Sequence, residues 1–360
     1  MQRIAIIGGG IAGLTVALRR ATAGDEVVLF EAGAKLGGQL SSESRDGFLV
    51  EHGAEGFVAR SEVVPTLAVE AGIADHIVEQ LEQRSFRFDG AQLIELAPGE
   101  AGRLLGFQVP SDELGRGIRS FRHGMAELPE RLGLALATQV QLQLNSHVKS
   151  VALHANGVTL LGSDGKTLDF DGVIVATTAR SAAALLGDAF GPTARALQES
   201  ALLSSLTVTL AFRREAILHP LDGTGFIVPA PDELGGLRAV TFSSSKLPHR
   251  APADHALLRL FFRPSDHDLR ALSDGAWAER AERALGRAIP LAAPPEQAFV
   301  SRWPSALPVF DDAHRARVRA LEAALVGRPI WLAGAAFHGS GIDAAIRSAE
   351  STSQAISSRS

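Results

Sequence analysis

The chain has 360 residues, of which 46% are hydrophobic and 21% charged, and its formal net charge is −5. This length suits about two domains of roughly 150 residues each, and the mild acidity argues against a nucleic-acid-binding protein, which would need a basic face. Because the chain has no cysteine and no tyrosine, disulfides, thiolate metal sites, a cysteine nucleophile, a cofactor linked through cysteine and any phenol chemistry are excluded.

The N-terminal residues predict neither export nor membrane insertion. Met1-Gln2-Arg3 leads directly into a strand pattern, without the charged, apolar and small-residue regions of a signal peptide. No apolar run approaches the ~18 residues of a membrane span, and the longest, 201–212, is interrupted by serine and threonine. We therefore expect a cytoplasmic protein without a transmembrane segment.

Hydrophobic periodicity predicts a β-α-β unit at the start of the chain, with a strand at 4–7, a helix at 11–23 and a strand at 26–30. Such units build parallel sheets. Further helices are expected at 62–83, 125–136, 274–288, 313–325 and 341–355, with another beginning at 181–186. A hairpin that turns at Asp89-Gly90 is expected at 86–95, and further strands are expected at 140–171, 172–177, 203–213, 224–229, 237–243, 256–263 and 329–333. Residues 97–119 are rich in glycine and proline and are expected to form a loop.

A glycine pattern in the first unit predicts a dinucleotide site. Gly8-x-Gly10-x-x-Gly13 lies between the first strand and the helix, and Glu31 ends the second strand. Such glycines allow a tight turn, a close approach of the backbone to a pyrophosphate, and packing of the helix on the strand. The phosphates then lie at the N-terminus of the helix, and the acid accepts hydrogen bonds from ribose hydroxyls.

The residues after Glu31 indicate which dinucleotide binds. They read Glu31-Ala32-x-x-Lys35-Leu36-Gly37-Gly38-Gln39-Leu40-Ser41, and later Glu51-His52-Gly53-Ala54-Glu55-Gly56-Phe57. This stretch resembles the FAD-binding segment of the amine oxidase/protoporphyrinogen oxidase superfamily. The resemblance implies non-covalent FAD, with the second glycine pair against the cofactor and 54–57 beside the flavin. Besides Gly8, Gly10, Gly13 and Glu31, the expected contacts are Ile11, Ala12, Ala32, Lys35, Gly37, Gly38, Gln39, Leu40, Gly53, Ala54, Glu55 and Gly56.

The C-terminal segment resembles the closing motif of the same superfamily. A strand is followed by Gly334 and Gly341, and a helix begins at Ile342-Asp343. A second fingerprint, Gly339-x-Gly341-x-x-Ala344, is rejected because too few residues follow for another β-α-β unit. We expect the N-terminus of this helix to face the flavin pyrimidine ring, where its positive dipole stabilises charge on the reduced flavin.

Together these segments predict an α/β fold. A discontinuous Rossmann-type FAD-binding domain is expected at 1–60, 120–178 and 328–360. An inserted α+β substrate-binding domain, with a mixed or antiparallel sheet, is expected at 61–119 and 179–327.

Three blocks carry a more specific resemblance: Ser120-Phe-Arg-His-Gly124, Ser244-Ser-Lys-Leu-Pro248 and Trp303-Pro-x-Ala-Leu-Pro308. They resemble the protoporphyrinogen and coproporphyrinogen oxidases. The resemblance implies two-electron dehydrogenation of protoporphyrinogen IX or coproporphyrinogen III, with O2 as acceptor and H2O2 as product. These oxidases carry a longer, membrane-associating segment where this chain has only 99–119. We therefore expect a shortened member with weak or absent membrane association.

The resemblance also indicates site residues outside the two glycine segments. It places Val148, Thr177 and Trp303 at the cofactor. Arg84 aligns with an arginine that meets a substrate propionate, and a guanidinium fork suits a carboxylate; the alternative is an exposed arginine on a hairpin. His338 either contacts the substrate or is a hydrogen-bonded loop histidine.

Other reactive groups are set aside. Lys246 is either an active-site lysine or, as we prefer, a structural charge at a strand end. Ser243-x-x-Lys246 matches a penicillin-binding nucleophile motif, but that motif needs its serine at a helix start, and Ser243 follows a predicted strand. No catalytic residue is assigned. No metal is expected, because the 11 histidines show no ligand spacing within one helix.

Two alternative functions stay open. The chain is either another oxidase of the superfamily, acting on an amine or a secondary metabolite, or a non-catalytic paralogue that keeps FAD as a structural ligand. Without tyrosine, an aromatic cage for an amine would need phenylalanine or tryptophan. The expected partners are a small-molecule substrate and O2, and the oligomeric state stays open.

Overall fold

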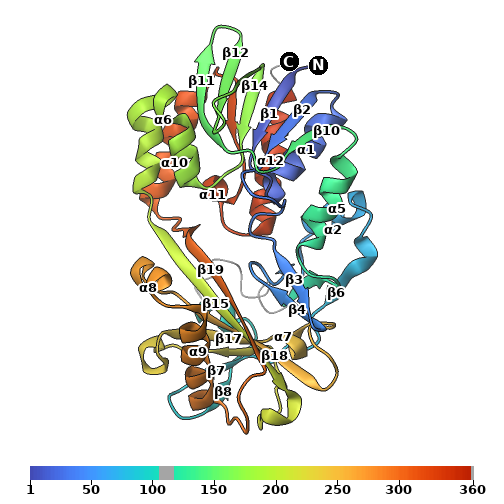
Figure 1. The fold of residues 1–360 in the computed structure, drawn as a ribbon, viewed down its shortest axis with the longest axis vertical. Coiled ribbons are helices and arrows are strands. Elements are labelled where there is room, and N and C mark those ends of the chain that lie inside the picture. Colours follow the sequence, from blue (N-terminus) through green and yellow to red (C-terminus); the bar gives the residue numbers. More distant parts are fainter. Residues whose placement is uncertain (105–116, 358–360) are drawn as a thin grey trace.

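A five-stranded parallel sheet brings together the two ends and the middle of the chain (Figure 1). The computed structural model describes residues 1–104 and 117–357. The strand order is β10-β2-β1-β14-β20, with bounds Val140–Gln143, Glu26–Phe30, Arg3–Ile7, Gly172–Val175 and Ile330–Leu332. Every neighbouring pair is parallel, and Ile4 lies opposite both Val27 and Gly172. This confirms the predicted Rossmann-type sheet.

Alternate side chains of β1 enter two different cores, because successive residues of a strand point to opposite faces. Ile4 and Ile6 share a core with α1 (Ile11–Thr22), α5 (Glu127–Leu136) and α12 (Ile342–Ser357). Ala5 and Ile7 pack on the other face, against a three-stranded antiparallel sheet and two helices. These are β11 (Val148–His154), β12 (Gly157–Gly162), β13 (Thr167–Phe170), α6 (Ala179–Arg195) and α10 (Asp312–Leu325).

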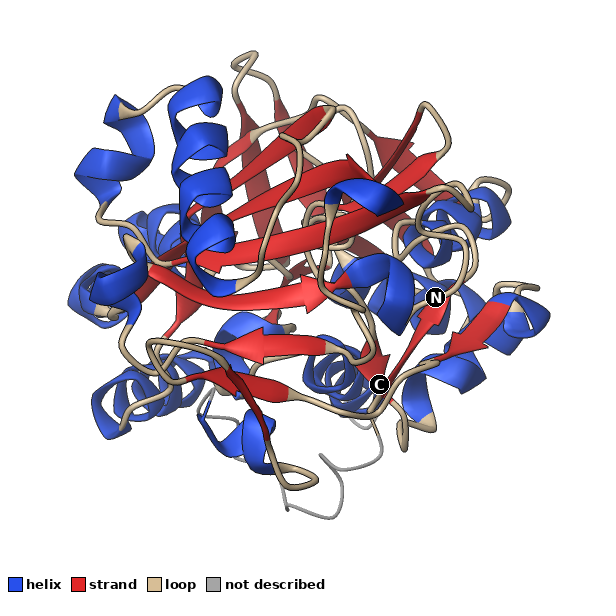
Figure 2. Cartoon of the chain, turned by 90° about the horizontal axis from the view of Figure 1, so that it is seen from below, coloured by secondary structure: helices blue, strands red, loops and turns tan. Residues whose placement is uncertain are grey.

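A seven-stranded sheet forms the other half of the molecule, and its strands cross the view from below in Figure 2. The order is β19-β15-β18-β17-β16-β7-β8, with bounds Gln297–Pro308, Leu202–Arg213, His255–Phe262, Leu237–Phe242, Gly225–Ile227, Phe86–Phe88 and Leu93–Glu95. Neighbours are antiparallel except β16 and β7, which are parallel with Phe226 opposite Phe86. The predicted mixed sheet is therefore confirmed.

The two faces of this sheet have different neighbours. On one face, α9 (Asp274–Ala288) buries Trp277 against Phe262. On the other, Leu257 and Phe299 share a core with Phe48 of β4 (Phe48–Glu51). Strand β4 pairs with β3 (Ser42–Arg45) in a hairpin that follows the N-terminal β-α-β unit. This apolar contact joins the two halves of the molecule.

The helix predicted at 62–83 is wrong beyond its first half. Helix α2 spans Val63–Glu70 and ends because Gly72 adopts φ +70°, a left-handed conformation that commonly terminates helices. The chain continues as a 3-10 turn, η1 (Ala74–His76), and as strand β6 (Ile77–Glu79). Strand β6 pairs with β9 (Ile118–Phe121) in a small sheet that also contains β5 (Phe57–Val58).

Several other elements differ from the sequence prediction or complete it. Within the loop predicted at 97–119, helix α3 spans Glu100–Leu104, while 105–116 lie outside the described residues. Strand β19 was not predicted, since two prolines and a charged residue interrupt its alternation. The remaining helices are α7 (Ser243–Lys246), α8 (Asp266–Ala271) and α11 (Ala335–His338). Among the described residues, no helix has the length and apolarity that crossing a membrane requires.

Candidate functional site

The fingerprint glycines close the first loop against its neighbours. Gly8 has φ +111°, and a Cβ there would lie 2.4 Å from the carbonyl oxygen of Ala176 in the turn after β14. A Cβ on Gly13 would lie 1.9 Å from the carbonyl oxygen of Gly8. Any larger residue at either position would push the helix or the neighbouring strand away. The glycines therefore set the distance between β1, α1 and β14.

Gly10 differs, because a Cβ there would meet no protein atom within 4 Å. It precedes α1 with φ −73° and makes no side-chain cap, so no side chain at this position takes up the first amide groups of the helix. Free amides at a helix N-terminus attract anions. This cradle therefore fits a dinucleotide pyrophosphate.

The second glycine pair lies directly against the first loop. The amide of Gly37 donates to the carbonyl of Gly9 at 2.8 Å, and Gly37 forms an isolated parallel bridge with Gly10. A Cβ on Gly38 would lie 3.4 Å from the Cα of Gly10. Glu31 faces the same loop, where its carboxylate accepts from the amides of Gly9 at 2.8 Å and Gly33 at 2.7 Å.

The far end of the chain meets this cradle. Gly334, at φ +116°, follows β20, and a Cβ there would lie 3.3 Å from the Cβ of Ala12. Its amide donates to the Ser348 hydroxyl of α12 at 2.9 Å. Gly341, at φ +97°, immediately precedes α12 and again has open space where a Cβ would be. The chains leaving the parallel strands β1 and β20 therefore enter α1 and α12 at the same edge of the sheet.

The loop after β4 is held by the seven-stranded sheet. Arg259 of β18, only 3% exposed, donates through Nη2 to the carbonyls of Gly53 at 2.7 Å and His52 at 3.1 Å. The Trp303 indole of β19 donates to the same His52 carbonyl at 2.7 Å. A Cβ on Gly53 would lie 1.8 Å from the carbonyl oxygen of Gln39. This loop is therefore clamped between the second glycine segment and the sheet.

Glu55 fixes the same loop through its side chain. Its carboxylate accepts from Lys246 Nζ at 3.0 Å and from the Ser243 hydroxyl at 2.8 Å, and the lysine and glutamate side chains are 15% and 9% exposed. Burial opposes ionisation of Glu55, but the Lys246 and Arg259 charges hold its pKa below its ordinary value. This geometry gives Lys246 a structural ion pair. Residues 243–246 form a one-turn helix rather than the predicted strand end, and Ser243 is committed to Glu55.

A second buried carboxylate lies at the end of β4. Glu51 accepts from the Ser42 hydroxyl at 2.6 Å and from the amide of Met125 at 2.9 Å, and Arg250 Nη2 lies 3.7 Å away. Burial raises the pKa of Glu51 to about 7, although these donors favour its charged form.

Of the two predicted substrate contacts, His338 shares the Ser348 hydroxyl with the Gly334 amide, whereas Arg84 has none of the cradle contacts described above. Arg84 is half-exposed and forms an ion pair with Asp222 at 2.6 Å, which raises the pKa of the guanidinium above its ordinary value. Both ring nitrogens of His338 are engaged, Nδ1 with the Ser348 hydroxyl at 2.7 Å and Nε2 with Glu322 at 2.6 Å. Both remain predictions as substrate contacts.

The other predicted cofactor residues differ in exposure. Val148 is buried, while Thr177 is half-buried beside Gly8. Ala32, Lys35 and Gln39 are exposed. Sequence patterns alone did not indicate Glu51 or Arg259. A charged residue inside the apolar run 256–263 was a usable signal for the arginine, because charged residues are almost never fully buried unless paired.

Comparison with known proteins supports the FAD interpretation. Residues 76–357 match the family model described as flavin-containing amine oxidoreductase, and residues 6–70 match an NAD(P)-binding Rossmann-like domain. The coproporphyrinogen III oxidase of Bacillus subtilis (strain 168) is 23% identical, over 95% of each chain. That of Mycobacterium tuberculosis (strain ATCC 25618 / H37Rv) is 26% identical, over 96% of this chain and 95% of the relative. The B. subtilis alignment runs over 448 residues against the 360 here, so the relative carries residues without a counterpart in this chain.

Solved structures share the fold. A protein from Exiguobacterium sp. 255-15, named as a proposed protoporphyrinogen oxidase, superposes with a TM-score of 0.82 at 24% identity, covering 100% of this chain and 99% of that one. Reduced UDP-galactopyranose mutase has a TM-score of 0.78 at 13% identity, covering 100% and 96%. At such identities the likeness concerns the fold alone.

Gly10→Ala tests the cradle. The methyl group would occupy space that is open in the protein, so we expect FAD affinity to fall at least about tenfold, which is about 1.4 kcal/mol. Stability without FAD should stay the same or rise slightly, because alanine fits φ −73° and restricts the unfolded chain. FAD titration and thermal unfolding measure the two effects. The matched control is Gly275→Ala on α9; unchanged FAD affinity in Gly10→Ala would count against the assignment.

Glu51→Gln tests the buried carboxylate. Its pKa of about 7 in the folded protein lies above its ordinary 4.5, so the stability linked to this group is fully present below pH 4.5 and is lost as pH rises through 7. Glutamine stays neutral. As the pH rises from 5 to 8, the variant should therefore gain stability relative to the parent, by up to about 3 kcal/mol. The free energies of unfolding of both proteins at pH 5 and at pH 8 measure this change. The exposed control Glu279→Gln should show no such trend, and a pH-independent difference for Glu51→Gln would contradict the expectation.

Proposed function

The chain belongs to the family of flavin-containing amine oxidoreductases, and we propose that it dehydrogenates a porphyrinogen, either coproporphyrinogen III or protoporphyrinogen IX, with O2 as electron acceptor. FAD is its cofactor. The observation that carries the proposal is the FAD cradle together with relatives over nearly the whole chain, in B. subtilis and M. tuberculosis, that are named coproporphyrinogen III oxidase.

The proposed reaction balances in two-electron steps. In each step a methylene bridge of the macrocycle loses a hydride and a pyrrole nitrogen loses a proton, so a new double bond forms in the ring system. When bound, FAD would supply the two-electron acceptor for this step and the route by which the electrons reach O2. With two protons, O2 becomes H2O2. The steps repeat until the ring is conjugated.

In this scheme, the residues of this chain bind the cofactor and orient it relative to the substrate. The amides at the start of α1 would hold the phosphates, and the N-terminus of α12 would supply a positive dipole to the flavin. Arg259, Lys246 and Ser243 fix the loop of 52–56. Fixed geometry between donor and acceptor matters more here than a strong base.

Turnover of the two porphyrinogens tests the proposal. The FAD-loaded protein should bleach anaerobically on addition of coproporphyrinogen III or protoporphyrinogen IX, and in air it should release H2O2 while the porphyrin absorbance appears. An amine panel run in parallel separates the amine oxidase alternative. Bound FAD without turnover of either porphyrinogen would refute the proposal and favour a non-catalytic FAD protein.

Arg84→Ala tests the propionate contact. Loss of a charge-assisted hydrogen bond costs about 1.5–3 kcal/mol, so we expect kcat/KM for a porphyrinogen to fall by about 10- to 100-fold, mainly through KM. The fold should persist, because an exposed ion pair such as Arg84–Asp222 contributes little to stability. The matched control is Arg213→Ala, which removes another half-exposed arginine that is ion-paired on the same sheet. Equal kinetics in the two variants would assign Arg84 a surface role.

A further inference from the structure

We propose that His76, His123 and Glu127 form a binding site for a divalent transition-metal ion, for which Zn2+ is the representative. None of the three residues belongs to the FAD cradle or to the loop of 52–56, and the proposed oxidase reaction does not use them. The site is therefore independent of the proposed function.

Three separate elements bring these side chains together. His76 ends η1, immediately before β6, and β6 pairs antiparallel with β9 so that Ile77 lies opposite Phe121. The amide of Arg122 donates to the carbonyl of His76 at 2.8 Å, which extends this pairing by one residue and brings His123 to the same end of the sheet. The chain then turns at Gly124, which has φ +95°. Glu127 is the first residue of α5, three residues later. The three ligands therefore come from three elements, and a search for histidines at ligand spacing within one helix does not find them.

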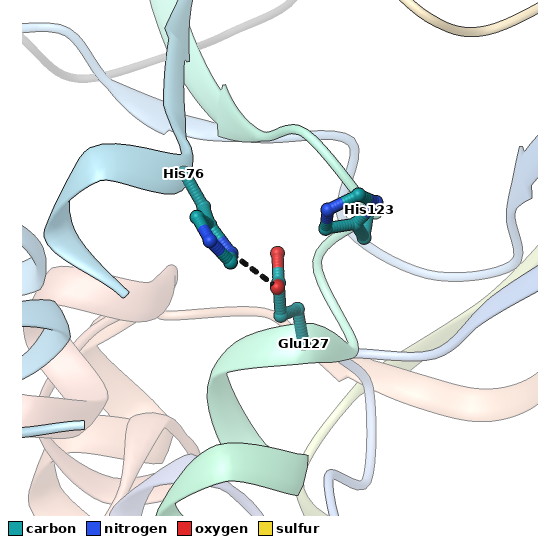
Figure 3. Close-up of side chains that lie close together, drawn as sticks. All are labelled: His76, His123 and Glu127. Carbon is teal, nitrogen blue, oxygen red and sulfur yellow. Dashed lines mark hydrogen bonds and ion pairs between the residues drawn. The ribbon is translucent and has the colours of Figure 1, made fainter. Parts of the chain in front are cut away.

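The geometry matches a three-ligand site. One ligand atom from each residue lies within 4.8 Å of the other two. His76 Nδ1 and Glu127 Oε1 are 2.5 Å apart, and the two imidazole rings lie edge to face with centroids 5.3 Å apart. Figure 3 shows the two histidines on either side of the glutamate, whose second oxygen points between them. Tetrahedral bonds of about 2.0–2.2 Å would separate nitrogen and oxygen ligands by roughly 3.3 Å. This separation lies between the 2.5 Å of the His76–Glu127 contact and the 4.8 Å within which all three ligand atoms fall, so side-chain rotation can reach it.

The carboxylate of Glu127 supplies an independent sign of a missing ligand. Its side chain is only 7% exposed, and its Oε2 atom is buried without a hydrogen-bond partner. A buried acceptor left unpaired costs about 1–3 kcal/mol, and more when it is charged. Neither histidine satisfies this oxygen, because His76 bonds to Oε1 and Oε2 has no hydrogen-bond partner. A cation between the carboxylate and the two rings would satisfy both oxygens.

The neighbours of the cluster suit a metal with an open position. The other nitrogen of His76, Nε2, lies 3.9 Å from the exposed carboxylate of Asp75, which adds negative charge beside the cluster. His123 also lines a cavity of about 370 Å³, so this ligand is accessible to solvent. Two imidazoles and one carboxylate are a ligand set of zinc sites with an open position, and Mg2+ prefers oxygen ligands.

An ion at this position would stabilise the folded protein. It would join the small β5-β9-β6 sheet to α5, whose Leu128 and Leu132 are fully buried in the core shared with α1. A ligand that binds only the folded state raises its stability by mass action. The site is therefore expected to act on stability rather than on turnover.

Calorimetric titration of Zn2+ into the metal-stripped, FAD-loaded chain tests the proposal. We expect one Zn2+ per chain, a rise of a few degrees in the unfolding temperature, and no binding of Mg2+. Anomalous scattering at the zinc edge should place the ion between His76, His123 and Glu127.

Variants separate this site from chance binding to surface histidines. His123→Ala removes an exposed side chain and should weaken Zn2+ binding at least tenfold, while its flavin absorbance shows that the protein still folds. Glu127→Gln should weaken binding as well. The matched control is His147→Ala, which removes an exposed histidine immediately before β11. This variant should bind Zn2+ like the parent. Equal Zn2+ affinity in His123→Ala and the parent, or an ion placed elsewhere, would overturn the proposal.

Discussion

The buried attachment of one loop to the seven-stranded sheet is the constraint on which this molecule depends. Glu55 is paired with Lys246, and Arg259 holds the loop backbone at Gly53. Removing one partner of a buried ion pair typically costs about 3–5 kcal/mol, because the other charge stays buried and uncompensated. The loop therefore cannot move independently of the sheet, and the cofactor half of the protein keeps a fixed position relative to the proposed substrate half.

The same constraint explains why segments far apart in the chain belong to one site. The glycine loop, the second glycine pair and Gly334 contact one another through positions where a side chain would clash or would fill the cradle. Behind them, the apolar contact of Phe48 with Phe299 supports the hairpin that leads into the clamped loop. The glycine segments pack closely on one side of the site, and the buried charges hold the loop of 52–56 on the other. Between them, the ends of the parallel strands form an open edge with free amides, which suits an anionic cofactor.

Local patterns were sufficient for most of the framework. Strong alternation or clear turn residues mark the β-α-β unit, the hairpin at Asp89-Gly90 and the antiparallel strands. Interactions between residues close in the chain are therefore enough to predict these elements. Prediction failed where a single glycine or a long-range strand pairing outweighed the local pattern. Gly72 ended a helix that periodicity alone would have continued, and β19 acquired its strand form from pairing with β15 despite its prolines. The partners of Lys246 were equally invisible, because Glu55 is 191 residues away.

By itself, the sequence determined the class of fold, the FAD fingerprint and the relationship to flavin oxidases, because each is encoded in spacings of a few residues. Only the tertiary structure decided which charges are buried together. It engaged both nitrogens of His338, gave Arg84 a partner in Asp222, and brought two histidines from different elements to the unpaired carboxylate oxygen of Glu127. Such contacts depend on strand pairing and helix placement over long chain separations, and no local pattern carries that information.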